Sequence, residues 1–236
     1  MKFIAHRGYS QKYKENSSKA FQKALEHNIN MIEADIRLSK DKQWVVTHDP
    51  TLFRLTHIDK WVDQVKSNTL KKFGIISLAN LLHIINDKIE LNLDIKGSPN
   101  LDDLRQLFYI LYTSGYQIKK FYLSSSDFQV VEKMITLRMT DPQLSNLKRE
   151  NNFKIGIIGY PHTIKKKNIK KYLDFISMYN DNLDLSYYLQ LRKDTNALIF
   201  VYTVNDKSGF KYFQEMGVDG IMSDDCTLFD KFASAR

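Results

Sequence analysis

Two histidines, an arginine and two closely spaced acidic residues lie within the first fifty positions of the chain, at His6, Arg7, Glu33, Asp35 and His48. A pair of imidazoles that flank a phosphate can act as general base and general acid. The planar guanidinium fork of arginine suits phosphate oxygens, and neighbouring carboxylates can hold a divalent cation. These side chains together are therefore suited to the cleavage of a phosphate ester.

A third carboxylate is predicted to join this group from a later strand. Between Glu90 and Lys96 polar residues alternate with apolar ones, so Asp94 and Lys96 share the polar face of a strand. Asp94 can then lie beside Glu33 and Asp35. Three carboxylates with open positions for water and phosphate suit one divalent cation, either Mg²⁺ or Ca²⁺.

A salt-bridge cluster without a metal is the alternative interpretation of the same residues. Three clustered carboxylates would repel one another, and at least one would be driven to its protonated form. Arg7 and Lys96 could offset that repulsion. In the metal-dependent interpretation the same two cations would instead bind phosphate, Arg7 through its fork and Lys96 as a point charge.

A β-hairpin is expected to bring His48 to the acidic pair. Apolar and polar residues alternate from Ile32 to Ser39, which predicts a strand with both carboxylates on one face. A polar turn centred near Asp41 and a second β run follow, so that His48 would return opposite Ala34 and Asp35. A slip of one residue in the register would turn the imidazole away.

Short β runs alternate with helical patterns along the whole chain. The expected strands are Lys2–His6, Met31–Asp35, Ile89–Ile95, Phe121–Ser125, Lys154–Gly159, Asp174–Tyr179, Leu198–Val204 and Gly220–Ser223. The expected helices are Ser17–His27, Ser77–Asn86, Leu101–Ser114, Asp127–Leu137, Thr163–Tyr172, Leu183–Leu191, Lys207–Met216 and Thr227–Ala233.

Eight βα units in one domain of residues 1–236 predict an α/β fold, a (β/α)₈ TIM barrel with a short hairpin and insertion after the second strand. Polar residues at several strand ends fit the active-site face of such a barrel. An open doubly wound sheet is the runner-up, but no G-x-G-x-x-G turn opens the first helix.

Composition narrows the classes of protein that remain. The net charge of +8 includes a lysine cluster at 165–171, which lacks the interleaved aromatics of a nucleic-acid site. No apolar run reaches the ~18 residues of a membrane span, and the N-terminus does not read as a secretory signal. We therefore expect a cytoplasmic enzyme with a small-molecule substrate, no nucleic acid and no stable membrane anchor. The oligomeric state does not follow from the sequence.

Seven motifs resemble those of the glycerophosphodiester phosphodiesterase family, in the same order along the chain. They are His6-Arg7-Gly8, Glu15-Asn16-Ser17, Glu33-Ala34-Asp35, Thr47-His48-Asp49, Asn92–Lys96, Tyr202–Asn205 and Gly217–Asp224. The resemblance implies a metal-assisted hydrolase on a (β/α)₈ barrel that releases glycerol 3-phosphate and an alcohol. It implies that His6 and His48 are the acid/base pair and that Glu33, Asp35 and Asp94 hold the cation. It also implies that Arg7 and Lys96 bind phosphate, and that Glu15 and Asn16 support Arg7 and the first strand.

The chain departs from the family pattern at four places, of which Ser17 in place of the usual Thr is the mildest because it keeps the hydroxyl. Asp94 stands where the family usually has Glu, which shortens that ligand by one methylene. Tyr202, expected at the substrate, replaces a typical Trp. The inserted segment Asp49–Ser77 is short, and its aromatic residues Phe53, Trp61 and Phe73 could line the substrate entrance or pack against the barrel.

Two further functions stay open. The first is a phospholipase-like member of the same barrel group that acts on lysophospholipids or phosphoinositides. The second is a catalytically silent phosphate-binding barrel, which Asp94 favours and the two histidines disfavour. For the leading function, either water or a neighbouring glycerol hydroxyl could attack the phosphorus.

Overall fold

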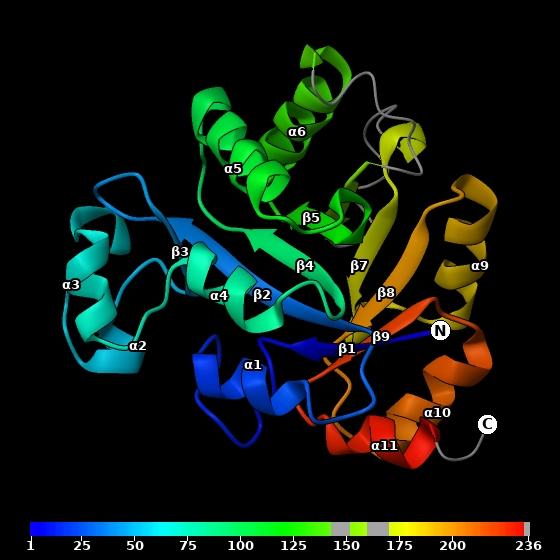
Figure 1. Cartoon of the computed structure of the whole chain (residues 1–236). Coiled ribbons are helices and arrows are strands. Elements are labelled where there is room, and N and C mark those ends of the chain that lie inside the picture. Colours follow the sequence, from blue (N-terminus) through cyan, green and yellow to red (C-terminus); the bar gives the residue numbers. More distant parts are fainter. Residues whose placement is uncertain (143–151, 160–169, 234–236) are drawn as a thin grey trace.

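Eight parallel strands close into a barrel in the computed structural model, which describes residues 1–142, 152–159 and 170–233 (Figure 1). The strands are β1 (Lys2–His6), β2 (Met31–Leu38), β4 (Glu90–Ile95), β5 (Phe121–Ser125), β6 (Lys154–Ile158), β7 (Phe175–Tyr179), β8 (Leu198–Tyr202) and β9 (Gly220–Ser223). Each strand pairs with its neighbour, and β1 closes the ring by pairing with both β2 and β9. The predicted barrel is confirmed, and the open sheet is excluded.

Helices surround the barrel, and several of them begin at polar capping residues. They are α1 (Ser18–Ala24), α4 (Leu78–Ile85), α5 (Leu101–Thr113), α6 (Phe128–Thr140), α9 (Leu185–Asp194), α10 (Lys207–Met216) and α11 (Thr227–Ala233). The side chains of Ser17, Ser77 and Asn100 each accept a backbone N–H at a helix start. Of the predicted helix Thr163–Tyr172 only a 3₁₀ turn at Lys170–Tyr172 is described, and the rest lies outside the described residues.

Aromatic side chains fill the lower half of the barrel interior. A cluster inside the ring is formed by Ile4, Met31, Tyr122, Phe175, Phe200 and Met222. Gly156 makes room for this packing, because a Cβ there would lie 2.4 Å from the ring of Phe175. Side chains therefore fill the barrel interior on the side of the amino ends of the strands, and a substrate site is expected at their carboxyl ends.

The hairpin formed by β3 and the second half of β2 has the predicted register. Strand β3 (Trp44–Val46) runs antiparallel to β2 with Ile36 opposite Val46, and the Thr47 N–H donates to Asp35 O over 2.9 Å. The same register places His48 opposite Ala34, so the slipped alternative is excluded.

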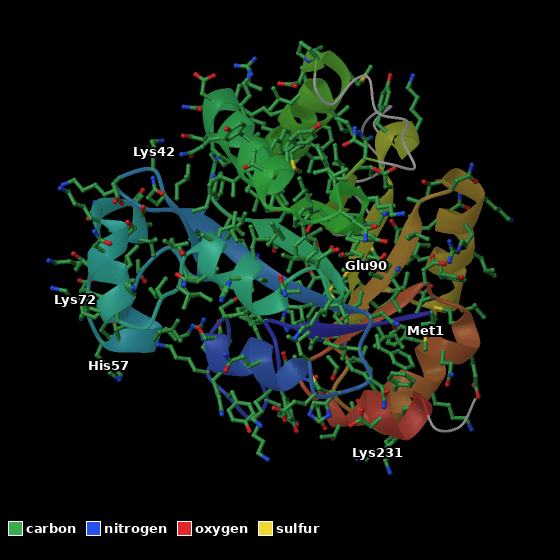
Figure 2. The ribbon with its side chains drawn as sticks, in the orientation of Figure 1. Met1, Lys42, His57, Lys72, Glu90 and Lys231 are labelled. Atoms are coloured by element: carbon green, nitrogen blue, oxygen red, sulfur yellow. The ribbon has the colours of Figure 1, made fainter. Side chains whose placement is uncertain are left out.

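The insertion folds beside the barrel around its own small apolar cluster. It contains α2 (Phe53–Thr56), a 3₁₀ turn at Val62–Gln64 and α3 (Ser67–Lys72), which lie beside β3 in Figure 1. Phe73 packs against the cluster, whereas Phe53 and Trp61 are 57% and 51% exposed. His57 and Lys72 of the insertion lie at the periphery of the molecule (Figure 2). None of the three aromatic residues lines the active-site cavity.

Candidate active site

A cavity of about 210 Å³ opens at the carboxyl ends of the barrel strands. It is lined by His6, Arg7, Glu33, Asp35, His48, Asn92, Asp94, Lys96, Ser126, Ile158, Ser177, Tyr202 and Met222. All eight residues predicted to act on the substrate, the phosphate or the cation therefore meet in one place. Glu15 and Asn16, predicted as supports, do not line the cavity but form hydrogen bonds with Arg7 and Asp35.

The three predicted acidic ligands converge because of the strand register. Asp35 of β2 lies opposite Asp94 of β4, and Glu33 lies opposite His6 of β1. One carboxylate oxygen from each of Glu33, Asp35 and Asp94 lies within 4.8 Å of the others, and all three side chains are buried. This spacing allows a single ion to contact all three carboxylates.

Two cations only partly offset these three acids. Arg7 Nε lies 3.1 Å from Asp35 Oδ2, which is an ion-pair distance without hydrogen-bond geometry, and the Arg7 N–H donates to Glu33 Oε2 over 2.9 Å. Lys96 Nζ pairs with Asp94 Oδ2 and lies 3.2 Å from Asp35 Oδ1. Three ionised acids against two cations would leave one negative charge uncompensated.

Burial and the neighbouring charges shift the pKa values of the three acids. Burial, reinforced by the neighbouring Asp35, raises the pKa of Glu33 to about 8. Burial raises the pKa of Asp94 to about 6, although Lys96 acts against it. Burial also opposes ionisation of Asp35, but Lys96 and Arg7 outweigh it and hold its pKa below the ordinary value.

The donor set fits a hard divalent cation. Three carboxylates are ligands of the kind that Mg²⁺ and Ca²⁺ prefer. Asp94 Oδ1 is buried and makes no hydrogen bond within the described part of the chain. The buried Ser177 Oγ and Asn92 Nδ2 of the same cavity also make none there. Because buried polar atoms are nearly always paired, the cavity is built to receive polar atoms from a ligand.

Each histidine is held by an aspartate through its Nδ1 atom. His6 Nδ1 lies 2.7 Å from Asp224 Oδ1, and His48 Nδ1 lies 2.8 Å from Asp49 Oδ1. Asp224 also accepts hydrogen bonds from Ser10 Oγ and Asn205 Nδ2. With Nδ1 engaged, Nε2 is the nitrogen of each ring that can exchange a proton with a ligand.

The two imidazoles differ in their affinity for protons. Burial lowers the pKa of His6, but the hydrogen bond with Asp224 and the charge of Glu33 outweigh it, so the net shift is upward. For His48, burial lowers the pKa by more than Asp35 and Asp49 raise it. The pKa of Asp49 is itself held at about 2, against the effect of burial, by Arg54 and His48.

The loop after β1 positions Arg7 and the predicted supporting residues. Arg7 has a φ of 57°, and Gly8 follows at 79°, where a Cβ would lie 2.7 Å from the backbone of Ala20. Glu15 accepts a hydrogen bond from Arg7 Nη1 over 3.1 Å. The Asn16 side chain bonds to Asp35 rather than to Arg7, through its Nδ2 and Oδ1 atoms, while its backbone N–H donates to Arg7 O.

Sequence reasoning did not assign the two aspartates that hold the histidines. Asp49 directly follows His48, so adjacency was a usable signal. Asp224 lies 218 residues after His6, and only the pairing of β9 with β1 brings them together. Ile158, Ser177 and Met222 were also not predicted to line the cavity.

Barrel geometry and site together are those of a hydrolase of phosphoric diesters. Residues 6–228 match the profile of the glycerophosphoryl diester phosphodiesterase family, and the chain belongs to that family. No helix among residues 1–142, 152–159 and 170–233 has the length and apolar character needed to cross a membrane.

Relatives of the chain resemble it over nearly the full length. A glycerophosphodiester phosphodiesterase of Bacillus altitudinis is 38% identical over 245 residues, which cover 94% of both chains. A human lysophospholipase D is 24% identical over 271 residues, covering 94% of this chain and 83% of the relative. A phosphodiesterase of Oleispira antarctica, solved with the product sn-glycerol-3-phosphate, has the same fold with a TM-score of 0.79 at 18% identity, over 100% of this chain and 96% of that one.

Proposed function

We propose that the protein hydrolyses glycerophosphodiesters to glycerol 3-phosphate and an alcohol, using two histidines and one divalent cation, Mg²⁺ or Ca²⁺. The observation that carries this proposal is the convergence of two histidine–aspartate pairs and three buried carboxylates on one cavity. Membership of the family and the glycerol 3-phosphate bound to the Oleispira relative support the same substrate class.

Arg7 and Lys96 bind the phosphate oxygens in this proposal. Both line the cavity beside the acids, and a guanidinium and an ammonium attract the negative diester into a site that otherwise carries surplus negative charge. Tyr202 lies next to His6, with ring centroids 6.5 Å apart, and borders the region where the alcohol or glycerol would lie.

His6 and His48 transfer the protons. One imidazole Nε2 takes a proton from the attacking oxygen as the new P–O bond forms, and the other gives a proton to the alcohol oxygen as its P–O bond breaks. Asp224 and Asp49 hold the rings in the orientation that this exchange needs. A cation held by Glu33, Asp35 and Asp94 would stabilise the negative charge that develops on the phosphoryl oxygens.

Hydrolysis of glycerophosphocholine after metal removal tests this proposal. We expect turnover to be lost in EDTA and restored by Mg²⁺ or Ca²⁺, and calorimetry to detect cation binding that Asp94→Asn weakens. Asp102→Asn, which removes an exposed carboxylate on α5, is the matched control and should change neither. Turnover that survives EDTA would remove the acidic group from the mechanism, and ligand binding without turnover under any cation would favour a silent barrel.

A lysophospholipid is the second candidate substrate, because the human relative is named a lysophospholipase D. Ile158, Tyr202 and Met222 give the cavity an apolar side that could contact a larger leaving group. Competition between glycerophosphocholine and lysophosphatidylcholine would decide between the two. In the same reactions, ³¹P NMR would reveal a cyclic phosphate if a glycerol hydroxyl attacks, and none if water does.

A further inference from the structure

One arginine of the insertion connects the residue that holds His48 with the residue that holds Arg7. Arg54 lies on α2, outside the cavity lining, and nothing in the proposed mechanism uses it. Its Nη1 and Nη2 atoms donate to the two oxygens of Glu15 over 3.0 and 2.7 Å. Its Nε donates to Asp49 Oδ2. One guanidinium thus binds two carboxylates at once.

Each of these carboxylates holds a group that faces the cavity. Asp49 uses its other oxygen, Oδ1, to hold His48 Nδ1 over 2.8 Å. Glu15 Oε1 also accepts a hydrogen bond from Arg7 Nη1 over 3.1 Å. The network therefore runs without interruption from the imidazole to the guanidinium of Arg7, with Arg54 in the middle.

The orientation of the His48 ring depends on this network, whereas the position of the His48 backbone does not. The His48 carbonyl is held separately, by Arg37 Nε over 2.8 Å. The ring is held by the side chain of the next residue, Asp49. Since Asp49 has a flexible side chain with a fifth of its surface exposed, a second partner is needed to keep it in one rotamer. Arg54 is that partner.

We infer that Arg54 is a positioning residue, which sets the His48 ring and the Arg7 guanidinium relative to each other across the mouth of the cavity. Arginine suits this role because its planar fork can bind two carboxylates in fixed directions, whereas a lysine ammonium is a point charge on a flexible stem. This inference rests on the proposed function, in which His48 transfers a proton and Arg7 binds phosphate.

A purely structural role, in which Arg54 only ties the insertion to the barrel, predicts different behaviour. The Arg54 side chain is 48% exposed, and ion pairs this accessible contribute little to stability. The folded fraction should therefore change little when Arg54 is replaced. An effect on catalysis can then be measured in protein that is still folded.

Steady-state kinetics of Arg54→Ala on glycerophosphocholine, with saturating cation, provides the first test. We expect kcat to fall about 10- to 100-fold, as for other residues that orient a reacting group, with a smaller change in KM. Arg54→Lys should recover only part of the loss. Guanidinium chloride far below denaturing concentrations should restore part of kcat to Arg54→Ala, because the site of the lost side chain is open to solvent.

Lys60→Ala is the matched control, since it removes an exposed cation of the same insertion. It should keep the kcat of the unmodified protein and show no response to guanidinium. An unchanged kcat in Arg54→Ala would overturn the inference. So would a loss that follows the unfolded fraction in thermal denaturation and is not rescued by guanidinium.

A spectroscopic readout separates this inference from the proposed function. In ¹⁵N-histidine-labelled protein, the His48 Nδ1–H bonded to Asp49 should give a slowly exchanging downfield proton signal, identified by its loss in His48→Ala. We expect Arg54→Ala to lose this signal and Lys60→Ala to keep it. If the unmodified protein turns over no phosphodiester, the proposed function fails, and the signal still decides the role of Arg54: its persistence in Arg54→Ala would refute the positioning role.

Discussion

The two aspartates that hold the imidazoles have further partners of different kinds. Asp224, which holds His6, receives its other hydrogen bonds from the neutral groups of Ser10 and Asn205. Asp49, which holds His48, instead pairs with the cationic Arg54. The pKa values of the two rings also shift in opposite directions, because burial prevails at His48 whereas Asp224 and Glu33 outweigh it at His6. Unlike surroundings of this kind are typical of acid/base pairs.

Replacing either ring should abolish most of the activity. We expect His6→Ala and His48→Ala each to lower kcat about 10²- to 10⁴-fold, the contribution usual for a general acid or base. Steady-state kinetics on glycerophosphocholine checks this, with His83→Ala on α4 as the control because that imidazole is exposed and outside the cavity. A loss below tenfold in either variant would contradict the two-histidine mechanism.

At the scale of elements, the hairpin formed by β2 and β3 determines where His48 lies. Its turn is held by Asp41, which accepts hydrogen bonds from Ser39 Oγ over 2.7 Å and from both Ser67 N and Ser67 Oγ over 2.8 Å. Asp41 thus joins the hairpin to the start of α3. These bonds, that of Ser39 first, lower the pKa of Asp41 to about 2.

Asp41→Asn should destabilise the fold in a pH-dependent way. The folded-state pKa of about 2 lies below the ordinary aspartate value of 3.8, so the contribution is present above about pH 4 and lost as the pH falls toward 2. At pH 7 we expect a loss of at most about 1 kcal/mol in the free energy of unfolding, because the group is exposed. Urea denaturation at pH 7, 5 and 3 measures it. A difference from the unmodified protein that is constant over this range would contradict the assignment to the Asp41 charge.

Elements differ in how far the sequence predicted them. The hairpin was predictable because period-two alternation around a polar turn is a local property of residues 32–47, and the structure has the same register. The insertion was not predicted as α2, a 3₁₀ turn and α3, because its apolar residues follow no single period and are buried against one another and against Val45 of β3. The sequence also could not identify Arg54 as a residue of the active-site network. Its partners Glu15 and Asp49 meet it only after the insertion has folded beside the barrel.

At the scale of the whole molecule, the barrel interior has two levels. Apolar and aromatic side chains fill the lower level, and the polar cavity occupies the upper one. Phe175 and Phe200 lie 5.3 Å apart between ring centroids at the lower level. Met222 belongs to both levels, so the packing below directly supports the cavity above.

Gly156→Ala should therefore destabilise the protein through overpacking. The new Cβ would lie 2.4 Å from the Phe175 ring, and we expect a loss of about 1–3 kcal/mol in the free energy of unfolding. Phe175→Leu should relieve part of this loss when it is combined with Gly156→Ala. A double-mutant cycle by urea denaturation measures the coupling, and strictly additive effects of the two changes would show that the ring is not the obstacle.

The pairing of His6 with Asp224 has a consequence for the making of the protein. Asp224 is synthesised 218 positions after His6. Domains begin to fold during synthesis, yet a nascent chain that has not reached β9 lacks the aspartate that orients His6. We expect translation intermediates that lack Asp224 to be inert toward phosphodiesters, and hydrolytic competence to arise only after β9 and Asp224 have been synthesised.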